Sequence, residues 1–266
     1  HLEERLNRET LADVALQVEP LTDAVGFRVS GRGELHLSIL IEKMRREDYE
    51  FQVTRPHVIM REEDGKTIEP YESLTVDVDE QYQGVVIEKL GKLKGVMSDM
   101  QVNNGMSRMI FKVPTRGLLG YRSQFMTDTR GMGVMNYVFA EWGPYAGEIQ
   151  NRQNGVMIVK EKCVSVAYAL FNLQERGTLF IHPGEDLYKG QIIGENCRSA
   201  DLVVNPAKGK KLTNMRASGS DEAVILVPPM SMSLEECISY INDDELVEIT
   251  PKIIRLRKQP DAKIRA

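Results

Sequence analysis

The apolar and polar positions of the first 64 residues change between a helical and a strand period. Leu35, Ile39 and Met44 lie near one stripe of a helix, whereas apolar and polar residues alternate on both sides of Gly26. The pattern therefore predicts helix, strand, strand, helix and strand, at residues 2–12, 14–20, 25–31, 33–47 and 49–62. This order matches a β-α-β-β-α-β plan whose opening strand is missing, which predicts that the chain begins inside a domain.

The next segment shows the complete plan. A strand, a helix, a hairpin, a second helix and a last strand are expected at residues 72–79, 84–95, 97–114, 116–131 and 133–142. Asn103-Asn104-Gly105 is a strong hairpin signal, and Gly95 is expected to cap the first helix. Arg130 to Gly133 is predicted to be a helix-to-strand turn rather than a dinucleotide-binding loop. The order is that of the ferredoxin-like split βαβ fold.

The remainder of the chain is rich in strand patterns with Gly and Pro turns. Strands are expected across residues 155–173, 177–196, 221–229 and 245–258. One short helix is predicted after Ser233, which can form a capping box with Glu236. We therefore predict an α+β chain of three domains, at residues 1–64, 65–146 and 147–266, the last a β-barrel-like domain with one short helix.

Composition narrows the functional classes. The chain has 266 residues, 42% of them apolar, and no apolar run long enough to cross a membrane. Its N-terminal stretch lacks the apolar core of a signal peptide. Three cysteines stand far apart, which argues against a disulfide framework or a zinc knuckle and favours a reducing compartment. A cytoplasmic protein is expected.

Charge is distributed unevenly. Residues 1–64 hold 9 bases and 14 acids, whereas 65–146 hold 9 of each and 147–266 hold 16 of each. Within the neutral last segment, residues 205–216 carry four cations and no acid. Cations and amides in such a stretch suit RNA, and Gly209 allows close approach to a phosphate. The alternatives are a solvated loop and a loop that binds an acidic protein partner.

Catalytic and metal-binding patterns are weak. No G-x-x-x-x-G-K-[ST] phosphate-binding string and no G-x-S-x-G string occurs. Asp243, Asp244 and Glu245 are expected to form a turn rather than a metal site, because no histidine accompanies them. His36 is expected to be structural. We therefore predict no catalytic residue, no metal site and no cofactor in this chain.

Longer motifs resemble known translation factors. Residues 30–47, SGRGELHLSILIEKMRRE, look like the third domain of elongation factor G, and residues 69–95 and 113–133 resemble its fifth domain. Residues 168–195, 210–223 and 241–258 are similar to the C-terminal domain of the TypA/BipA family of bacterial translational GTPases. The chain is thus expected to be the C-terminal half of such a protein, with GTP and Mg²⁺ held by an N-terminal domain that it lacks.

This resemblance implies a function and candidate sites. It implies docking on the ribosome, contact with rRNA and A-site tRNA through residues 205–216, and roles in large-subunit assembly and in translation under stress or cold. A monomer with no membrane or DNA partner is expected. The predicted RNA-binding residues are Lys208, Lys210, Lys211, Asn214 and Arg216, and the possible secondary rRNA contacts are Lys89, Lys92 and Lys94.

Overall fold

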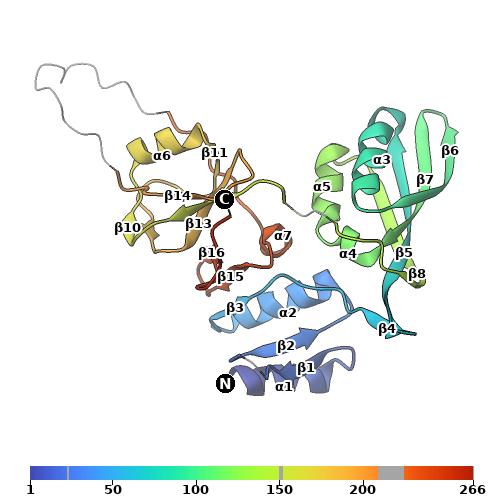
Figure 1. Ribbon diagram of the computed structural model, residues 1–266, viewed down its shortest axis with the longest axis horizontal. Coiled ribbons are helices and arrows are strands. Elements are labelled where there is room, and N and C mark those ends of the chain that lie inside the picture. Colours follow the sequence, from blue (N-terminus) through green and yellow to red (C-terminus); the bar gives the residue numbers. More distant parts are fainter. Residues whose placement is uncertain (23, 150–151, 209–224, 266) are drawn as a thin grey trace, which may run out of the picture. The chain divides into compact units, whose positions relative to one another are not determined.

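The computed structural model describes residues 1–22, 24–149, 152–208 and 225–265. These residues form two compact units (Figure 1). Unit 1 joins His1–Arg55 to Arg152–Ala266, and unit 2 is Pro56–Asn151. The first and third segments of the sequence therefore share one unit, while the three-domain division stays a prediction. The mixed α+β class is confirmed.

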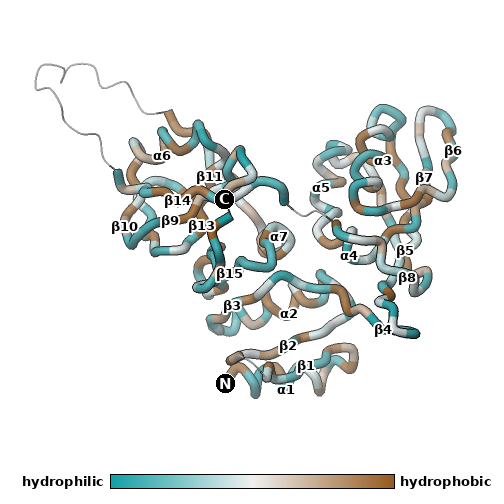
Figure 2. Tube along the Cα trace, viewed as in Figure 1, coloured by the Kyte–Doolittle hydropathy of each residue, from teal (hydrophilic) through white to brown (hydrophobic). Residues whose placement is uncertain are grey.

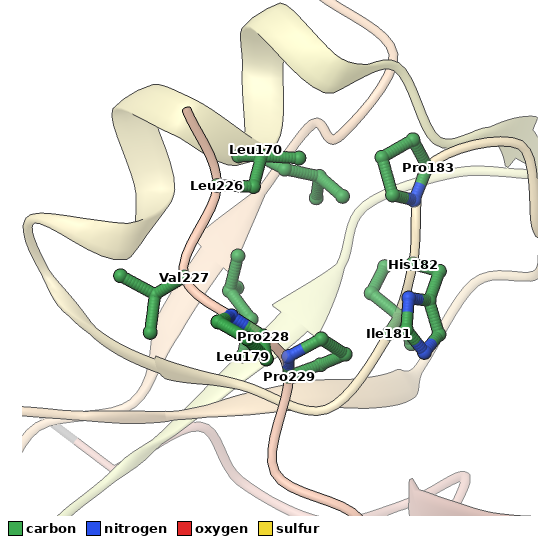
Figure 3. A pocket seen from close by; sticks show the side chains of 9 residues that line it. All are labelled: Leu170, Leu179, Ile181, His182, Pro183, Leu226, Val227, Pro228 and Pro229. Atoms are coloured by element: carbon green, nitrogen blue, oxygen red, sulfur yellow. The ribbon is translucent and has the colours of Figure 1, made fainter. Parts of the chain in front are cut away.

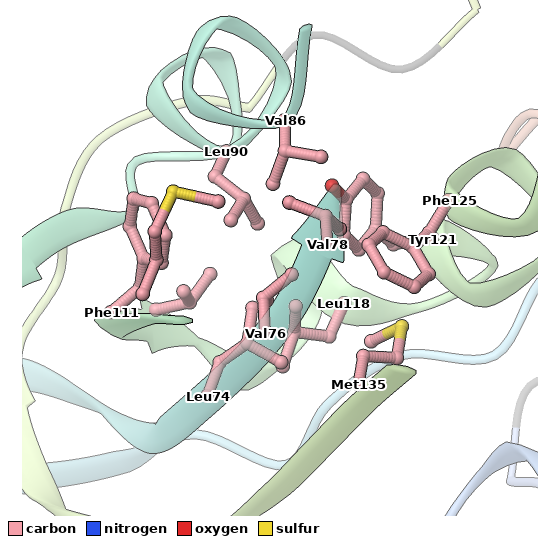
Figure 4. Packing of buried hydrophobic residues seen from close by; sticks show 12 residues of the cluster. Leu74, Val76, Val78, Val86, Leu90, Phe111, Leu118, Tyr121, Phe125 and Met135 are labelled. Atoms are coloured by element: carbon pink, nitrogen blue, oxygen red, sulfur yellow. The ribbon is translucent and has the colours of Figure 1, made fainter. Parts of the chain in front are cut away.

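Unit 2 has the predicted split βαβ order. Its elements are β4 (Arg61–Glu63), β5 (Lys66–Asp79), the short 3₁₀ helix η1 (Glu80–Tyr82), α3 (Gln83–Lys92), β6 (Val96–Asn103), β7 (Met106–Pro114), α4 (Thr115–Leu118), α5 (Tyr121–Asp128) and β8 (Val134–Pro144). All pairings are antiparallel, with β5 between β7 and β8, and β6 beyond β7. The helices cover one face of this sheet, where Leu74, Val76 and Val78 meet Val86 and Phe125 (Figure 4).

Two tight turns in unit 2 follow from residues that tolerate positive φ. Asn104 and Gly105 have φ values of 52° and 80° between the paired residues Asn103 and Met106, so the predicted hairpin is confirmed. Asp64 and Gly65 make the same turn between β4 and β5, with φ values of 51° and 69°. Asp64-Gly65 is likewise a hairpin signal that can be read in the sequence.

Two expectations for the helices of unit 2 were wrong in detail. The helix expected across 116–131 is divided, because Gly120 takes a left-handed φ of 72° between α4 and α5. The left-handed residue after α3 is Lys94, with φ 64°, rather than Gly95. Gly95 is required for another reason, since a Cβ there would lie 2.9 Å from the carbonyl oxygen of Leu90.

The N-terminal part of unit 1 contains α1 (Leu2–Ala12), β1 (Gln17–Pro20), β2 (Phe27–Ser30), α2 (Glu34–Arg46) and β3 (Phe51–Val53). These are the five predicted elements in the predicted order. Strands β1 and β2 form a hairpin, and Leu6, Leu40 and Met44 pack together beneath it. Arg5 fastens α1 to α2 through a bidentate pair with Glu47.

The C-terminal part of unit 1 is built around one sheet. Its elements are β9 (Val156–Val159), β10 (Cys163–Val164), α6 (Ala167–Gln174), β11 (Gly177–Leu179), β12 (Asp186–Leu187), β13 (Gln191–Asn196), β14 (Leu202–Val204), α7 (Leu234–Tyr240), β15 (Glu245–Ile249) and β16 (Ile254–Lys258). The sheet order is β14-β9-β13-β16-β15-β3, with β11 on β13. All four residues of the interior strand β9, between β14 and β13, are buried and apolar, and β9 is brown in Figure 2.

Strand β3 joins this sheet from the other end of the sequence. Val53, Gln52 and Phe51 pair antiparallel with Val247, Glu248 and Ile249 of β15. In the split βαβ plan the last strand lies beside the first strand, and the described N-terminal part has no such strand. The last strand of the first segment is therefore the edge strand of the C-terminal sheet.

Three expectations for this part need correction. The described strands form an open sheet with ends at β14 and β3, so the barrel is not closed. The strand expected across 155–173 ends early, and α6 follows it, because a short apolar run suits a buried helix as well as a strand. The described residues 225–229 are irregular rather than a strand, as Pro228 and Pro229 lack the amide hydrogens that strand pairing uses.

Candidate nucleic-acid interface

Of the predicted RNA-binding residues, only the first falls within the described part of the chain. Lys208 is described and exposed. Lys210, Lys211, Asn214 and Arg216 lie outside the described residues. Before them, the Asn205 side chain accepts the amide hydrogen of Ala207 at 3.0 Å and donates to the Glu161 carboxylate at 3.1 Å. Asn205 therefore fixes the backbone turn at which residues 205–208 leave the sheet.

The described chain on each side of residues 209–224 is fastened to helix α6. On the N-terminal side, the amide of Val166, the residue that precedes α6, donates to the Pro206 carbonyl at 3.0 Å. On the C-terminal side, the Gln174 amide group donates to the Ile225 carbonyl at 3.2 Å and accepts from the Val227 amide at 3.0 Å. The described residues that flank 209–224 are thus held at opposite ends of the same helix.

Residues 225–230, which we call the strap, continue from this attachment across the sheet. Leu226 packs on the apolar core, and the Met230 amide donates to the Leu179 carbonyl at 2.8 Å. Beneath the strap lies a depression of about 270 Å³, lined by Leu170, Leu179, Ile181, His182, Pro183, Leu226, Val227, Pro228 and Pro229 (Figure 3). Its lining is apolar apart from the His182 ring, which is the one titratable side chain among these lining residues.

Lysines gather at the N-terminal end of α6. The Lys160 amide donates to the Val204 carbonyl at 2.9 Å, which places the exposed Lys160 and Lys162 near the start of the basic stretch that continues with Lys208. None of these three lysines forms an ion pair with a carboxylate in the part of the chain that the structure describes. Glu161 lies among these lysines, and Glu185 and Asp186 approach the same end of α6 beside Ser165 and Val164.

A buried ion network joins distant parts of the sequence within unit 1. Lys258 lies 3.0 Å from Asp201, 2.7 Å from Asp244 and 3.1 Å from Glu245. Burial lowers the pKa of the Lys258 ammonium, but the hydrogen bond to Asp244 and the charges of Glu245 and Asp201 outweigh it, so this pKa is raised overall. Arg152, stacked on the Tyr240 ring, adds a bidentate pair with Glu245.

The sequence predicted only part of this network. Asp243 and Asp244 do form the expected turn, but Glu245 begins β15 and is fully buried. Its role could not be found from spacing, because Arg152 and Lys258 come from distant parts of the chain. In the described ranges, no group of three or more His, Cys, Asp or Glu side chains is arranged to hold a metal ion.

The predicted secondary contacts lie in unit 2. Lys92 pairs with Glu88 at 2.6 Å on the surface of α3, Lys94 is exposed in the turn that follows, and Lys89 is half-buried. His36, in unit 1, is structural as expected. Its Nδ1 accepts the Arg32 amide at 3.1 Å, and its Nε2 donates to Asp13 at 2.8 Å.

Two known protein families match successive parts of the chain, from residue 66 to residue 263. Residues 66–153 match the family described as elongation factor G C-terminus, which is the class of domain that unit 2 defines. Residues 154–263 match the TypA/BipA C-terminal domain. The chain belongs to the TypA/BipA family and corresponds to the C-terminal part of these proteins.

Whole-length relatives agree with this assignment. The chain is 55% identical over 258 residues to the large ribosomal subunit assembly factor BipA of Salmonella typhimurium, covering 96% of this chain and 42% of the relative. It is 51% identical over 264 residues to the protein of the same name from Synechocystis, covering 99% and 44%. The chain therefore spans less than half the length of the curated relatives it matches. No helix among the described residues is long and apolar enough to span a membrane.

Proposed function

We propose that this chain is the ribosome-binding part of a translational GTPase, and that residues 205–216 contact rRNA and A-site tRNA. The observation that carries the proposal is that the described residues on both sides of 209–224 are bound to the two ends of α6. Three lysines nearby have no carboxylate partner among the described residues: Lys160, Lys162 and Lys208. The four cations within residues 205–216, with no acid between them, suit contact with the phosphates of RNA. The relatives' name, large ribosomal subunit assembly factor, supports a ribosomal partner.

In this proposal the catalytic step lies outside the chain. GTP and Mg²⁺ would be bound by an N-terminal domain of the whole protein, since the present sequence has no phosphate-binding string of the GTPase type. GTP hydrolysis there would determine when the binding half leaves the ribosome. The whole protein would act in the cytoplasm as a monomer, in large-subunit assembly and in translation under stress or cold.

The lysines of unit 2 have a secondary place in the proposal. Lys94, exposed after α3, is the best placed for an rRNA contact, because Lys92 already pairs with Glu88 and Lys89 is half-buried. Replacing Lys94 with alanine should weaken ribosome binding less than changes within residues 205–216.

The experiment is co-sedimentation of the full-length protein with ribosomes at several salt concentrations. Lys210→Ala/Lys211→Ala should bind more weakly, and the slope of log affinity against log salt should fall by about 2 if two phosphate contacts are lost. Lys252→Ala/Lys263→Ala is the matched control, because it removes the same charge from exposed positions elsewhere in unit 1. Equal affinities and slopes for the two variants would refute the proposed contact.

The same assay separates RNA from an acidic protein partner. RNase treatment of the bound fraction should release the protein if RNA carries the contact. Retention after RNase treatment, with binding still dependent on Lys210 and Lys211, would favour the protein-binding alternative.

A further inference from the structure

Helix α6 exposes aromatic side chains to solvent on the outside of the C-terminal part. Tyr168 and Phe171 are three residues apart on α6 and are 38% and 37% exposed, whereas Ala169 and Leu170 on the opposite side are buried. The Asn172 side-chain amide donates a hydrogen bond to the Tyr168 carbonyl at 2.8 Å. Two large rings therefore stand on one face of a helix whose other face is committed to the core.

The position of these rings relates them to the basic stretch. Gln174 follows Phe171 by three residues and holds Ile225 and Val227, which are 77% and 69% exposed. Pro206 is bound at the opposite end of the helix. The aromatic face consequently lies between Pro206 and Ile225, the described residues held at the two ends of α6.

We infer that the α6 face formed by Tyr168 and Phe171 stacks unpaired bases of single-stranded RNA. The inference rests on the proposed function and specifies the part of the RNA that is recognised. Aromatic rings stack on the face of any base, and cations beside them hold the phosphates that connect successive bases. Lys160, Lys162 and Lys208 supply such cations at one end of the helix.

The lysines beside this face favour a polyanion such as RNA over an apolar protein surface as its partner. An apolar protein surface would gain nothing from three lysines without carboxylate partners in the described ranges, whereas a polyanion would. A base-paired RNA helix would hide its base faces, so the rings favour a single strand or an unpaired end. The sequence does not predict this site, because the pattern across residues 155–173 is that of a strand.

The test is binding of the full chain to a fluorescent single-stranded RNA of twelve mixed-sequence nucleotides, beside an abasic oligonucleotide of the same length. Tyr168→Leu/Phe171→Leu should bind the RNA at least about tenfold more weakly with an unchanged salt slope, because stacking on each ring contributes well over a factor of five. Its affinity for the abasic strand should equal that of the unchanged protein. Tyr168→Phe/Phe171→Tyr, which keeps both rings, should bind as the unchanged protein does.

A second measurement needs no variant. RNA containing 4-thiouridine should crosslink to Tyr168 or Phe171 of the unchanged chain on irradiation, with the crosslinked peptide identified by mass spectrometry. Crosslinks confined to other parts of the chain would overturn the inference even if the leucine variant were unstable.

The outcomes distinguish the two proposals. Normal RNA binding by the leucine variant, together with weak binding by Lys210→Ala/Lys211→Ala, would overturn the stacking site and leave the proposed function intact. Equal losses on RNA and on the abasic strand would also overturn stacking. No binding of RNA or ribosomes by the unchanged chain would refute both proposals.

Discussion

The Arg152 guanidinium donates to both carboxylate oxygens of Glu245, at 3.0 and 2.6 Å, and so fixes the point at which the chain re-enters unit 1. Glu245 also accepts the backbone amide of Asn242 at 3.0 Å. Burial lowers the pKa of Arg152, but its hydrogen bond to Glu245 and the charge of that carboxylate outweigh burial, so this pKa is raised. Arg152 therefore stays charged throughout the ordinary pH range.

Removal of the Glu245 carboxylate should be costly. Glu245→Ala leaves the guanidinium of Arg152 buried without its partner, which typically lowers the free energy of unfolding by about 3–5 kcal/mol. Hydrogen exchange of the β15 and β16 amides should report this loss in unit 1. As a control, Arg46→Met breaks the exposed pair between Arg46 and Glu42 and should cost about 1 kcal/mol or less. A loss of similar size in both variants would contradict the buried role of Glu245.

Cysteine reactivity should differ sharply between two positions. Burial, followed by the charges of Glu236 and Glu235, raises the pKa of the Cys237 thiol to about 12. Because the thiolate is the nucleophile, almost none of Cys237 is reactive at pH 8. Cys197 is exposed, so iodoacetamide at pH 8 should label it first, with Cys237 labelled only in denaturant. Mass spectrometry of the alkylated peptides checks this order, and early labelling of Cys237 would show that α7 opens readily.

A matched pair of glycine substitutions should act in opposite directions in unit 2. A Cβ at Gly133 would lie 2.5 Å from the Phe125 ring, so Gly133→Ala should lower the free energy of unfolding by about 1–3 kcal/mol through overpacking. A Cβ at Gly91 in helix α3 meets nothing within 4 Å, so Gly91→Ala should raise it by about 0.5–1 kcal/mol. Thermal denaturation measures both changes, and a stabilised Gly133→Ala variant would show that Phe125 moves aside easily.

The capping box of α7 should contribute to the stability of unit 1. Ser233 Oγ accepts the Glu236 amide at 3.3 Å, and Glu236 accepts the Ser233 amide at 2.7 Å. Ser233→Ala should therefore lower the free energy of unfolding by about 1 kcal/mol, and Ser233→Gly by only a few tenths. Urea titration of the two variants distinguishes them. Identical urea midpoints of unfolding for Ser233→Ala and the unchanged chain would show that the capping box does not stabilise unit 1.

Local signals in the sequence predicted local structure well. Asn104-Gly105 and the Ser233 capping box act within a few residues, and both are found where they were expected. Glu245 and Tyr168 show where prediction failed. The partners of Glu245 come from distant parts of the chain, and the apolar run around Tyr168 fits strand and helix equally until its contacts are known.

The pairing of β3 with β15 sets an order for folding during synthesis. Residues 51–53 cannot pair with residues 247–249 until the latter have been synthesised. Unit 2, by contrast, has all of its strands once about residue 144 has been made. Because the ribosome adds about 5–20 residues per second, the N-terminal elements spend on the order of ten seconds without this neighbour. Unit 2 thus has all of its strands before the two sequence segments of unit 1 can pair. Until β15 is made, the unpaired edge of β3 is open to incorrect pairing in the nascent chain.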